Sequence, residues 1–164
     1  MNNVPRTGPT VLLWLFVINL GIAFGAGIYE HRIVTPDWIS ADGSRSHWNA
    51  EAARRHDTGL RFWAYVTTGP LTFLTLASLV VAWKASGPER RWWVASAILV
   101  LVDRVLTFGY FIPTMVGLMN APDSPASVAV ATRWATVNYL RHALLLAGWL
   151  SALRAFALRY QGHR

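Results

Sequence analysis

The sequence predicts an all-α integral membrane protein: a four-helix bundle with a short extramembrane cap helix between its first and second helices. Two observations support this fold class. Apolar residues make up 54% of the 164 residues, and charged residues only 14%, against about 25% in an average soluble domain. Four apolar stretches are long enough to cross a membrane, since about 20 helical residues span ~30 Å of hydrocarbon. We expect a single transmembrane domain over residues 1–164.

The absence of charge locates the four stretches. Thr7–Tyr29 and Phe62–Trp83 contain 23 and 22 residues without a charged side chain. The third stretch, Trp92–Asn120, holds only Asp103 and Arg104, and the fourth holds a few basic side chains. Backbone groups in lipid must bond to each other, so we expect each stretch to be helical. The expected helices cover about residues 9–32, 60–84, 91–120 and 127–158.

The first helix has two features with alternative interpretations. A cleaved signal peptide is one alternative, but the apolar run exceeds the roughly 7–15 residues typical of such a peptide, so we expect the helix to be retained. Gly21-xxx-Gly25 and Ala23-xxx-Gly27 place small residues at a spacing that lets helix backbones approach closely. These residues serve either packing within the chain or the seam of a homodimer.

The connection between the first two helices, Ile33–Leu60, is long enough to indicate a functional segment. Pro36, Asp42 and Gly43 are expected to break the start of this connection, and Ser46–Asp57 is expected to form the cap helix over the mouth of the bundle. Glu51 and Arg55 are an i,i+4 pair on that helix, and Gly59 suits its C-terminal cap. Two tryptophans of this connection are expected at the membrane interface, which Trp favours: Trp38 and Trp48.

The distribution of basic residues predicts the orientation. Four spans place both termini and the Lys84–Arg91 connection on one side, with more basic residues close to the helix ends than on the other side. We therefore expect both termini in the cytoplasm and the protein in the plasma (inner) membrane. The net charge of +7 suits anionic lipid headgroups. Nucleic acid is not an expected partner, because the longest basic runs are Arg54-Arg55 and Arg90-Arg91.

Four ionisable residues lie inside the third and fourth spans, where their cost makes them candidate functional residues: Asp103, Arg104, Arg141 and His142. Asp103 lies 12 residues after Arg91, which is about 18 Å along a helix. Arg141 lies 13 residues before Arg154, which is about 20 Å from the same side. We therefore expect Asp103 to face Arg141 or His142. Arg104 is offset by about 100° and is expected to use a carboxylate of its own.

Each of these residues belongs to a polar stripe. On the third helix, four polar residues share one face at the spacing i, i+4, i+7 and i+11: Asp103, Thr107, Tyr110 and Thr114. On the fourth helix, the spacing i, i+3 and i+4 joins Asn138, Arg141 and His142. Fainter stripes on the first two helices include Asn19, Glu30 and Thr67. The stripes predict a polar pocket inside the bundle, roofed by the cap helix.

The charge of this cluster leaves several interpretations open. One Asp beside two Arg leaves a positive charge, and a guanidinium would stabilise an anion, a phenolate or an enolate. A buried Asp103–Arg141 pair would equally fix the register of two helices without any catalytic role. A proton-coupled carrier is a third interpretation, since intramembrane Asp and His relay protons, although four spans without an internal repeat disfavour it.

No motif identifies a metal or a cofactor. Four histidines are candidate metal ligands: His31, His47, His56 and His142. No two of them lie at the spacing i,i+3 or i,i+4, and no HExxH sequence occurs. The chain has no Cys, which excludes a disulfide scaffold, a thiol active site and a Cys-ligated metal. We predict no metal site, and the cofactor remains unknown.

Three short motifs resemble those of a known family. Tyr110-Phe111-Ile112-Pro113-Thr114 places a Pro-Thr element late in the third helix. The fourth helix carries a Trp-x3-Asn-x2-Arg element, and the first connection a basic-x3-Pro-x-Trp pattern: Trp134, Asn138 and Arg141, then Arg32, Pro36 and Trp38. In these motifs the chain resembles the anthrone oxygenase-like family of small four-helix membrane proteins. The resemblance implies the fold and, because fungal members are linked to oxidation of an anthrone to an anthraquinone, an oxidoreductase.

Together these arguments predict a redox or oxygenase-like enzyme that acts on a hydrophobic aromatic or phenolic small molecule in an intramembrane pocket. Arg141 would stabilise a substrate oxyanion, and His142 or Asp103 would remove a proton. Five further residues are assigned to substrate binding: Arg104, Tyr110, Thr114, Trp134 and Asn138. The alternative is a non-enzymatic accessory or structural subunit, with a proton-coupled carrier third.

Overall fold

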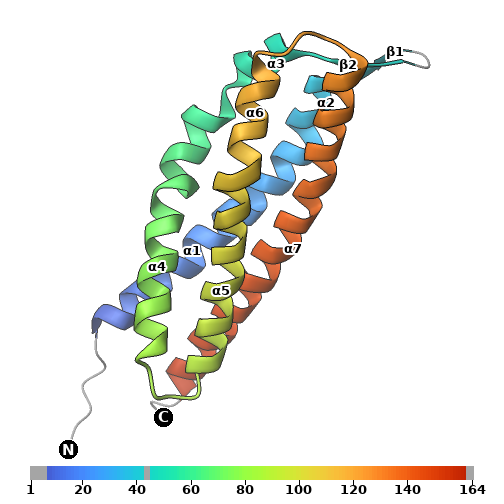
Figure 1. Cartoon of the computed structure of the whole chain (residues 1–164). Helices are drawn as coiled ribbons and strands as arrows, with labels where there is room; N and C mark the ends of the chain where they lie inside the picture. The colour runs from blue at the N-terminus through green and yellow to red at the C-terminus, as the bar shows by residue number, and fades with distance from the viewer. Residues whose placement is uncertain (1–6, 43–44, 162–164) are drawn as a thin grey trace, which may run out of the picture.

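Four long helices form the structure, a computed structural model that describes residues 7–42 and 45–161 (Figure 1). The first span runs through α1 (Thr7–Tyr29), the π-helical η1 (Glu30–Val34) and α2 (Thr35–Trp38). The second joins the π-helical η2 (Gly59–Thr68) to α4 (Pro70–Trp83). The third joins α5 (Arg90–Leu106), the π-helical η3 (Thr107–Phe111) and α6 (Ile112–Met119). The fourth is the single helix α7 (Pro125–Gln161).

Within the described part of the chain, these four helices are each long and apolar enough to cross a membrane. The chain is therefore an all-α, multi-pass integral membrane protein, as predicted. Around the bundle, α1 packs against α4 and α7, and α5 packs against the same two helices. Thr7 and Gln161 lie at one end of the bundle, which we call the terminal end (Figure 1). The connection between the first two spans covers the opposite end, the capped end.

π-helical segments interrupt three of these spans, and each ends two residues before a proline: Pro36, Pro70 and Pro113. Proline lacks an N–H and its ring crowds the carbonyl four residues earlier, so an α-helical ladder cannot run through it unbroken. The change to a π turn lets a new α-helix begin, with the proline in its first turn where the missing N–H is tolerated. We expected Pro36 to break the start of the first connection; instead it lies in the first turn of α2, which begins at Thr35, and the span continues to Trp38.

A carbonyl released by Pro70 finds its partner on another helix. Val66 lies four residues before Pro70, and its carbonyl oxygen accepts a hydrogen bond of 2.8 Å from the Asn19 side chain on α1. An unpaired carbonyl inside a membrane is costly. This bond explains why the otherwise apolar α1 carries Asn19.

The cap consists of a β-hairpin and a short helix. β1 (Ile39–Asp42) pairs antiparallel with β2 (Arg45–Trp48), and α3 (Ala50–His56) follows. The cap helix is therefore present but shorter than the expected Ser46–Asp57. It starts later because Asn49 caps it: the Asn49 Oδ1 accepts a 2.9 Å hydrogen bond from the third residue of the helix.

The C-terminal end of α3 differs from the expected glycine cap. Asp57 ends the helix in the left-handed region, at a φ of 43°, and its N–H donates to the Ala53 carbonyl at 3.2 Å. Asp tolerates this conformation better than most residues, which leaves Gly59 to begin η2. The expected Glu51–Arg55 pair is present at 3.0 Å.

Two apolar cores fill the bundle on either side of a polar layer. The core toward the terminal end joins all four spans and includes Phe16, Leu71, Val100 and Leu145. The core at the capped end includes Trp38, Trp48, Phe111 and Trp134. We expected Trp38 and Trp48 at the membrane interface; both are instead buried, at 2% and 3% exposure, because the Trp48 indole donates to the Leu118 carbonyl at 2.9 Å and both rings pack inside the cap.

Small residues bring α1 close to α7. A Cβ atom on Gly21 would lie 3.2 Å from the Trp149 ring, and one on Gly27 would lie 3.0 Å from the His142 Nε2. A Cβ atom on Gly25 would meet nothing within 4 Å. Gly21 and Gly27 therefore serve packing within the chain, and a homodimer seam stays a prediction.

Candidate functional site

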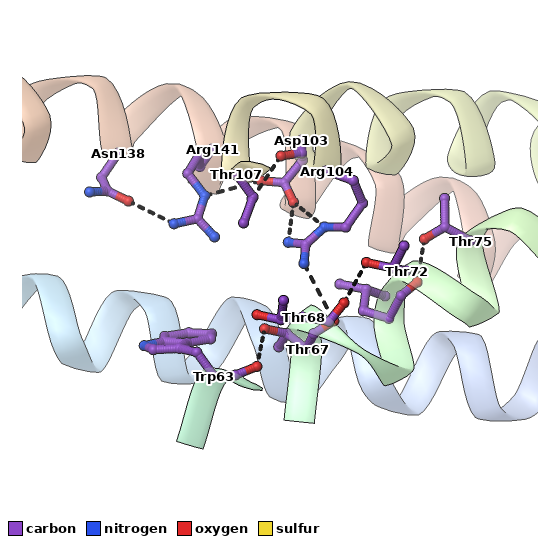
Figure 2. A network of polar contacts seen from close by, with 11 residues as sticks. Trp63, Thr67, Thr68, Thr72, Thr75, Asp103, Arg104, Thr107, Asn138 and Arg141 are labelled. Carbon is purple, nitrogen blue, oxygen red and sulfur yellow. Dashed lines mark hydrogen bonds and ion pairs between the residues drawn. The ribbon is translucent and has the colours of Figure 1, made fainter. Parts of the chain in front are cut away.

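Asp103, on α5, is the centre of a polar network between the two cores (Figure 2). Its side chain is fully buried, and the neighbouring Arg104 is 2% exposed. Arg104 donates from Nε to the Asp103 Oδ2 at 3.0 Å and from Nη2 to the same oxygen. Arg141, on α7, donates from Nε to the Asp103 Oδ1 at 3.2 Å. Asp103 thus faces Arg141, one of the two expected partners, and both of its oxygens are engaged.

Arg104 also differs from its expected role. It shares Asp103 with Arg141 instead of using a carboxylate of its own, because its side chain folds back onto the preceding residue. Its Nη1 donates to the Thr67 carbonyl of η2 at 3.4 Å. The network therefore links α5, α7 and η2, and its one carboxylate and two guanidiniums carry a net charge of +1.

Arg141 is held on three sides. Besides its bond to Asp103, its Nη1 donates to the Asn138 Oδ1 at 3.2 Å. Its guanidinium carbon lies 4.6 Å from the centre of the Phe111 ring, which is a cation–π contact. Among the described residues no acceptor bonds to its Nη2, which carries no dashed line in Figure 2. The Arg141 side chain is 15% exposed, so an immobilised cationic donor lies at the edge of the network.

His142 belongs to a different cluster. It lies on the face of α7 toward α1, where the absence of a side chain on Gly27 admits its ring. The ring centres of His31 and His142 are 5.5 Å apart, and the Tyr139 ring lies 4.5 Å from His31. The Nδ1 atoms of both histidines are buried without a hydrogen-bond partner in the described part of the chain. His31 entered the sequence analysis only as a candidate metal ligand, because no spacing along the sequence pairs α1 with α7.

Glu30 is a second engaged carboxylate that the sequence analysis did not assign to the site. It begins η1, and its Oε1 accepts hydrogen bonds from the Trp63 indole at 2.9 Å and from the Thr58 hydroxyl. Both donors come from the second span or its start. Glu30 therefore joins the first two spans near the capped end, as Asp103 joins the third and fourth.

The residues assigned to substrate binding divide into two groups. Trp134 and Asn138 lie with Arg141: the Trp134 indole donates to the Phe111 carbonyl at 3.2 Å, and Asn138 is 6% exposed. Tyr110 instead packs edge-on against Phe111, with ring centres 5.1 Å apart. Thr114 lines an apolar groove between α6 and α7. In the described residues neither Tyr110 nor Thr114 has a hydrogen bond or ion pair to the network.

Two hollows lie near the capped end, and neither is lined by Asp103 or Arg141. The larger, of about 580 Å³, lies between β2, α3 and the connection from α6 to α7. The smaller is the apolar groove, of about 360 Å³.

The described residues contain no group of three or more His, Cys, Asp or Glu side chains that would hold a metal ion. Two of the candidate ligands are engaged in the cap. His47 lies 2.8 Å from Asp123, and His56 lies 3.4 Å from Asp37. The His47 hydrogen bond, together with one from the Trp48 N–H, holds the pKa of the Asp123 carboxyl below its usual value.

No family model, curated protein or solved structure matches this chain. The fold and the site by themselves define a multi-pass helical membrane protein with a buried polar network of net positive charge.

Proposed function

We propose that the protein is a membrane-embedded, anthrone oxygenase-like enzyme that oxidises a hydrophobic phenolic molecule or aromatic ketone. The observation that carries the proposal is the state of Arg141. Asp103, Asn138 and Phe111 fix its guanidinium, and its Nη2 has no acceptor among the described residues. A fixed cationic donor in a site of low dielectric stabilises a developing oxyanion without having to reorganise. The family resemblance supports the same class of substrate.

Hydrogen-bond partners favour His142 over Asp103 as the base. Both oxygens of Asp103 already accept N–H donors from two guanidiniums, so Asp103 is a positioning residue that orients Arg141. His142 follows Arg141 directly, and its Nδ1 has no partner in the described chain. We therefore assign proton removal to His142, which produces an enolate or phenolate whose oxygen is bound by Arg141.

The overall reaction balances with dioxygen as the oxidant. A methylene group beside the aromatic rings loses two hydrogen atoms and gains one oxygen atom as a carbonyl. The second oxygen atom leaves as water, which carries the two hydrogen atoms. This chain's own residues remove the first proton and hold the resulting negative charge, which makes the substrate carbon electron-rich enough to react.

The test uses the full chain in lipid nanodiscs with anthrone as substrate, following anthraquinone formation and dioxygen consumption above the spontaneous rate. Arg141→Gln is expected to lower kcat by about 10²–10³-fold, which is typical for the loss of one oxyanion donor. Arg133→Gln is the matched control, an exposed arginine on the same helix. Equal turnover by the two variants, or no turnover above background by the unaltered protein, would overturn the proposal.

A structural role is the second candidate, because the full engagement of Asp103 favours it. The network ties α5 to α7 directly and to η2 through the Thr67 carbonyl, which is what a device for helix register requires. In that case the triple substitution Asp103→Leu, Arg104→Met and Arg141→Met, which removes every charge of the network, would leave the protein folded. The enzyme proposal expects the same triple variant to be inactive.

We also propose that both termini face the cytoplasm across the plasma membrane, on the basis of the basic residues near the terminal end. The absence of Cys makes this testable by single-cysteine labelling. Ser86→Cys at the terminal end is expected to be protected from a membrane-impermeant maleimide in intact cells. Ser46→Cys in the cap, which is also exposed, is expected to react. The opposite pattern would reverse the orientation.

A further inference from the structure

The two hollows at the capped end adjoin each other and differ in chemistry. The larger is lined by polar side chains of the cap and of the connection from α6 to α7, and the smaller is an apolar groove along α6 and α7. Ala121 lines both of them. A polar hollow and an apolar groove therefore lie next to each other where the third span ends, which is the arrangement that an amphiphilic molecule requires.

The polar hollow is rich in hydrogen-bond donors. Arg54 uses its Nη1 on the Met119 carbonyl, which leaves its Nε and Nη2 for a ligand. His47 uses its Nδ1 on Asp123 at 2.8 Å, and Asn49 uses its Oδ1 to cap α3, which leaves the Asn49 amide nitrogen as a further donor. Arginine with further N–H donors is the donor set that binds phosphate best.

One acidic side chain, Asp123, also lines this hollow. Its two oxygens are both engaged, Oδ2 by the His47 ring and Oδ1 by the Trp48 N–H at 2.9 Å. Asp123 is thus turned toward its own partners, and among the described residues Arg54 makes no ion pair with it or with another carboxylate. The hollow therefore favours an anionic group.

The apolar groove owes its depth to small residues. Pro113, Gly117, Ala121 and Ala126 line it, and a Cβ atom on Gly117 would meet nothing within 4 Å. The groove belongs to the two membrane spans that contain α6 and α7. An acyl chain lying in it would cover the face of α6 that carries Gly117, which has no side chain.

We propose that the capped end binds one phospholipid, with its phosphate in the donor-rich hollow and one acyl chain in the groove between α6 and α7. The position of Ala121 in the lining of both hollows and the donor set around Arg54 favour this occupant, because a phospholipid joins an anionic phosphate to an acyl chain in one molecule. The inference is independent of the proposed reaction at Arg141.

The test is native mass spectrometry of the purified full chain, titrated with dioleoyl phosphatidylglycerol. Arg54→Gln is expected to weaken retention of one lipid about tenfold, the effect of one lost charge-assisted hydrogen bond. Arg55→Gln is its control, because Arg55 is bonded to Glu51 and does not line the hollow. Gly117→Leu fills the groove and is expected to weaken retention at least about fivefold. Its control is Gly25→Leu, at an equally open glycine on α1.

Two parallel titrations decide the source of binding. Dioleoylglycerol, which has no phosphate, is expected to bind weakly, and inorganic phosphate alone is expected not to compete. Competition by phosphate alone would make the hollow a free-anion site and would overturn the lipid proposal. A shift of Gly117→Leu from dimer to monomer without loss of lipid would assign the groove to a second copy. Equal retention by all four variants would also overturn the proposal.

Discussion

The Asp103 network and the histidine cluster lie side by side on α7, yet their polar atoms are used differently. Asp103 accepts bonds from two arginines, and those arginines bond further to Asn138 and to the Thr67 carbonyl. His31 and His142 contact each other through their rings, and their Nδ1 atoms bond to no described residue. Bonded polar groups hold geometry, whereas an atom without a partner leaves its bonding capacity unused. Position inside a membrane therefore identifies candidate residues, and hydrogen-bond partners show which of them are held in place.

The largest expected effect on stability comes from breaking the Asp103 network. Asp103→Asn removes the carboxylate between two buried guanidiniums, and the loss of one partner of a buried ion pair costs about 3–5 kcal/mol. We expect this variant to lower the free energy of unfolding by that amount in nanodiscs, measured by thermal or denaturant unfolding. Asp37→Asn is the control, because its carboxylate is 61% exposed and meets only His56. Similar losses in both variants would contradict the central role of Asp103.

The next largest effect on stability is expected from a substitution beside the histidine cluster. In Gly27→Ala the new Cβ atom would lie 3.0 Å from the His142 Nε2, so the imidazole must move. We expect a loss of about 1–3 kcal/mol in unfolding free energy, which is typical of overpacking, and a changed His142 signal in nitrogen NMR. Gly25→Ala adds the same methyl group where nothing lies within 4 Å, and it is expected to change neither quantity. An unchanged His142 signal in Gly27→Ala would show that the ring is not held there.

Positions along the helices could be predicted from the sequence, whereas bonding partners could not. Hydropathy locates the four spans because every residue facing lipid must be apolar, and the helical rise places Asp103 level with Arg141 because α5 and α7 are regular between their ends and these residues. The cap hairpin was missed because four-residue strands carry little periodic signal, and the Glu51–Arg55 pair favours helix. Which side chain bonds to which cannot be obtained from spacing, as the shared use of Asp103 by two arginines shows.

The polar stripe on the third span shows where the periodicity argument ends. Asp103, Thr107, Tyr110 and Thr114 share one face only if the helix keeps 3.6 residues per turn. The π-helical η3 begins at Thr107, and its wider turns change the direction of every later side chain. Thr107 still bonds to the Asp103 carbonyl at 2.8 Å, whereas Thr114 lines the groove beside α7. Pro113 is the residue in the sequence that signals this break.

A smaller effect on stability is expected from removing the Asn19 side chain, which donates a hydrogen bond to a backbone carbonyl that Pro70 leaves without its helical partner. Asn19→Ala removes the donor to the Val66 carbonyl, and interhelical hydrogen bonds in membranes contribute about 1 kcal/mol. Pro70→Ala supplies an N–H four residues after Val66 and so offers that carbonyl a partner within its own helix. We expect Asn19→Ala to cost less in the Pro70→Ala background, measured as a double-mutant cycle of unfolding free energies. Additive effects would show that Asn19 does not compensate for the proline.

The smallest effect concerns an exposed ion pair and contrasts with the buried Asp103 network. The hydrogen bonds from His47 and Trp48 hold the pKa of Asp123 below its usual value in the folded protein, so the folded state favours the carboxylate. The stabilising contribution is therefore fully present above the unfolded pKa, near pH 4, and is lost as the pH falls through the lower folded value. Asp123→Asn should lower the Tm slightly at neutral pH, and the difference from the unaltered protein should shrink as the pH falls below about 4. A Tm difference that stayed constant with pH would show that the charge of Asp123 does not hold the cap to the connection from α6 to α7.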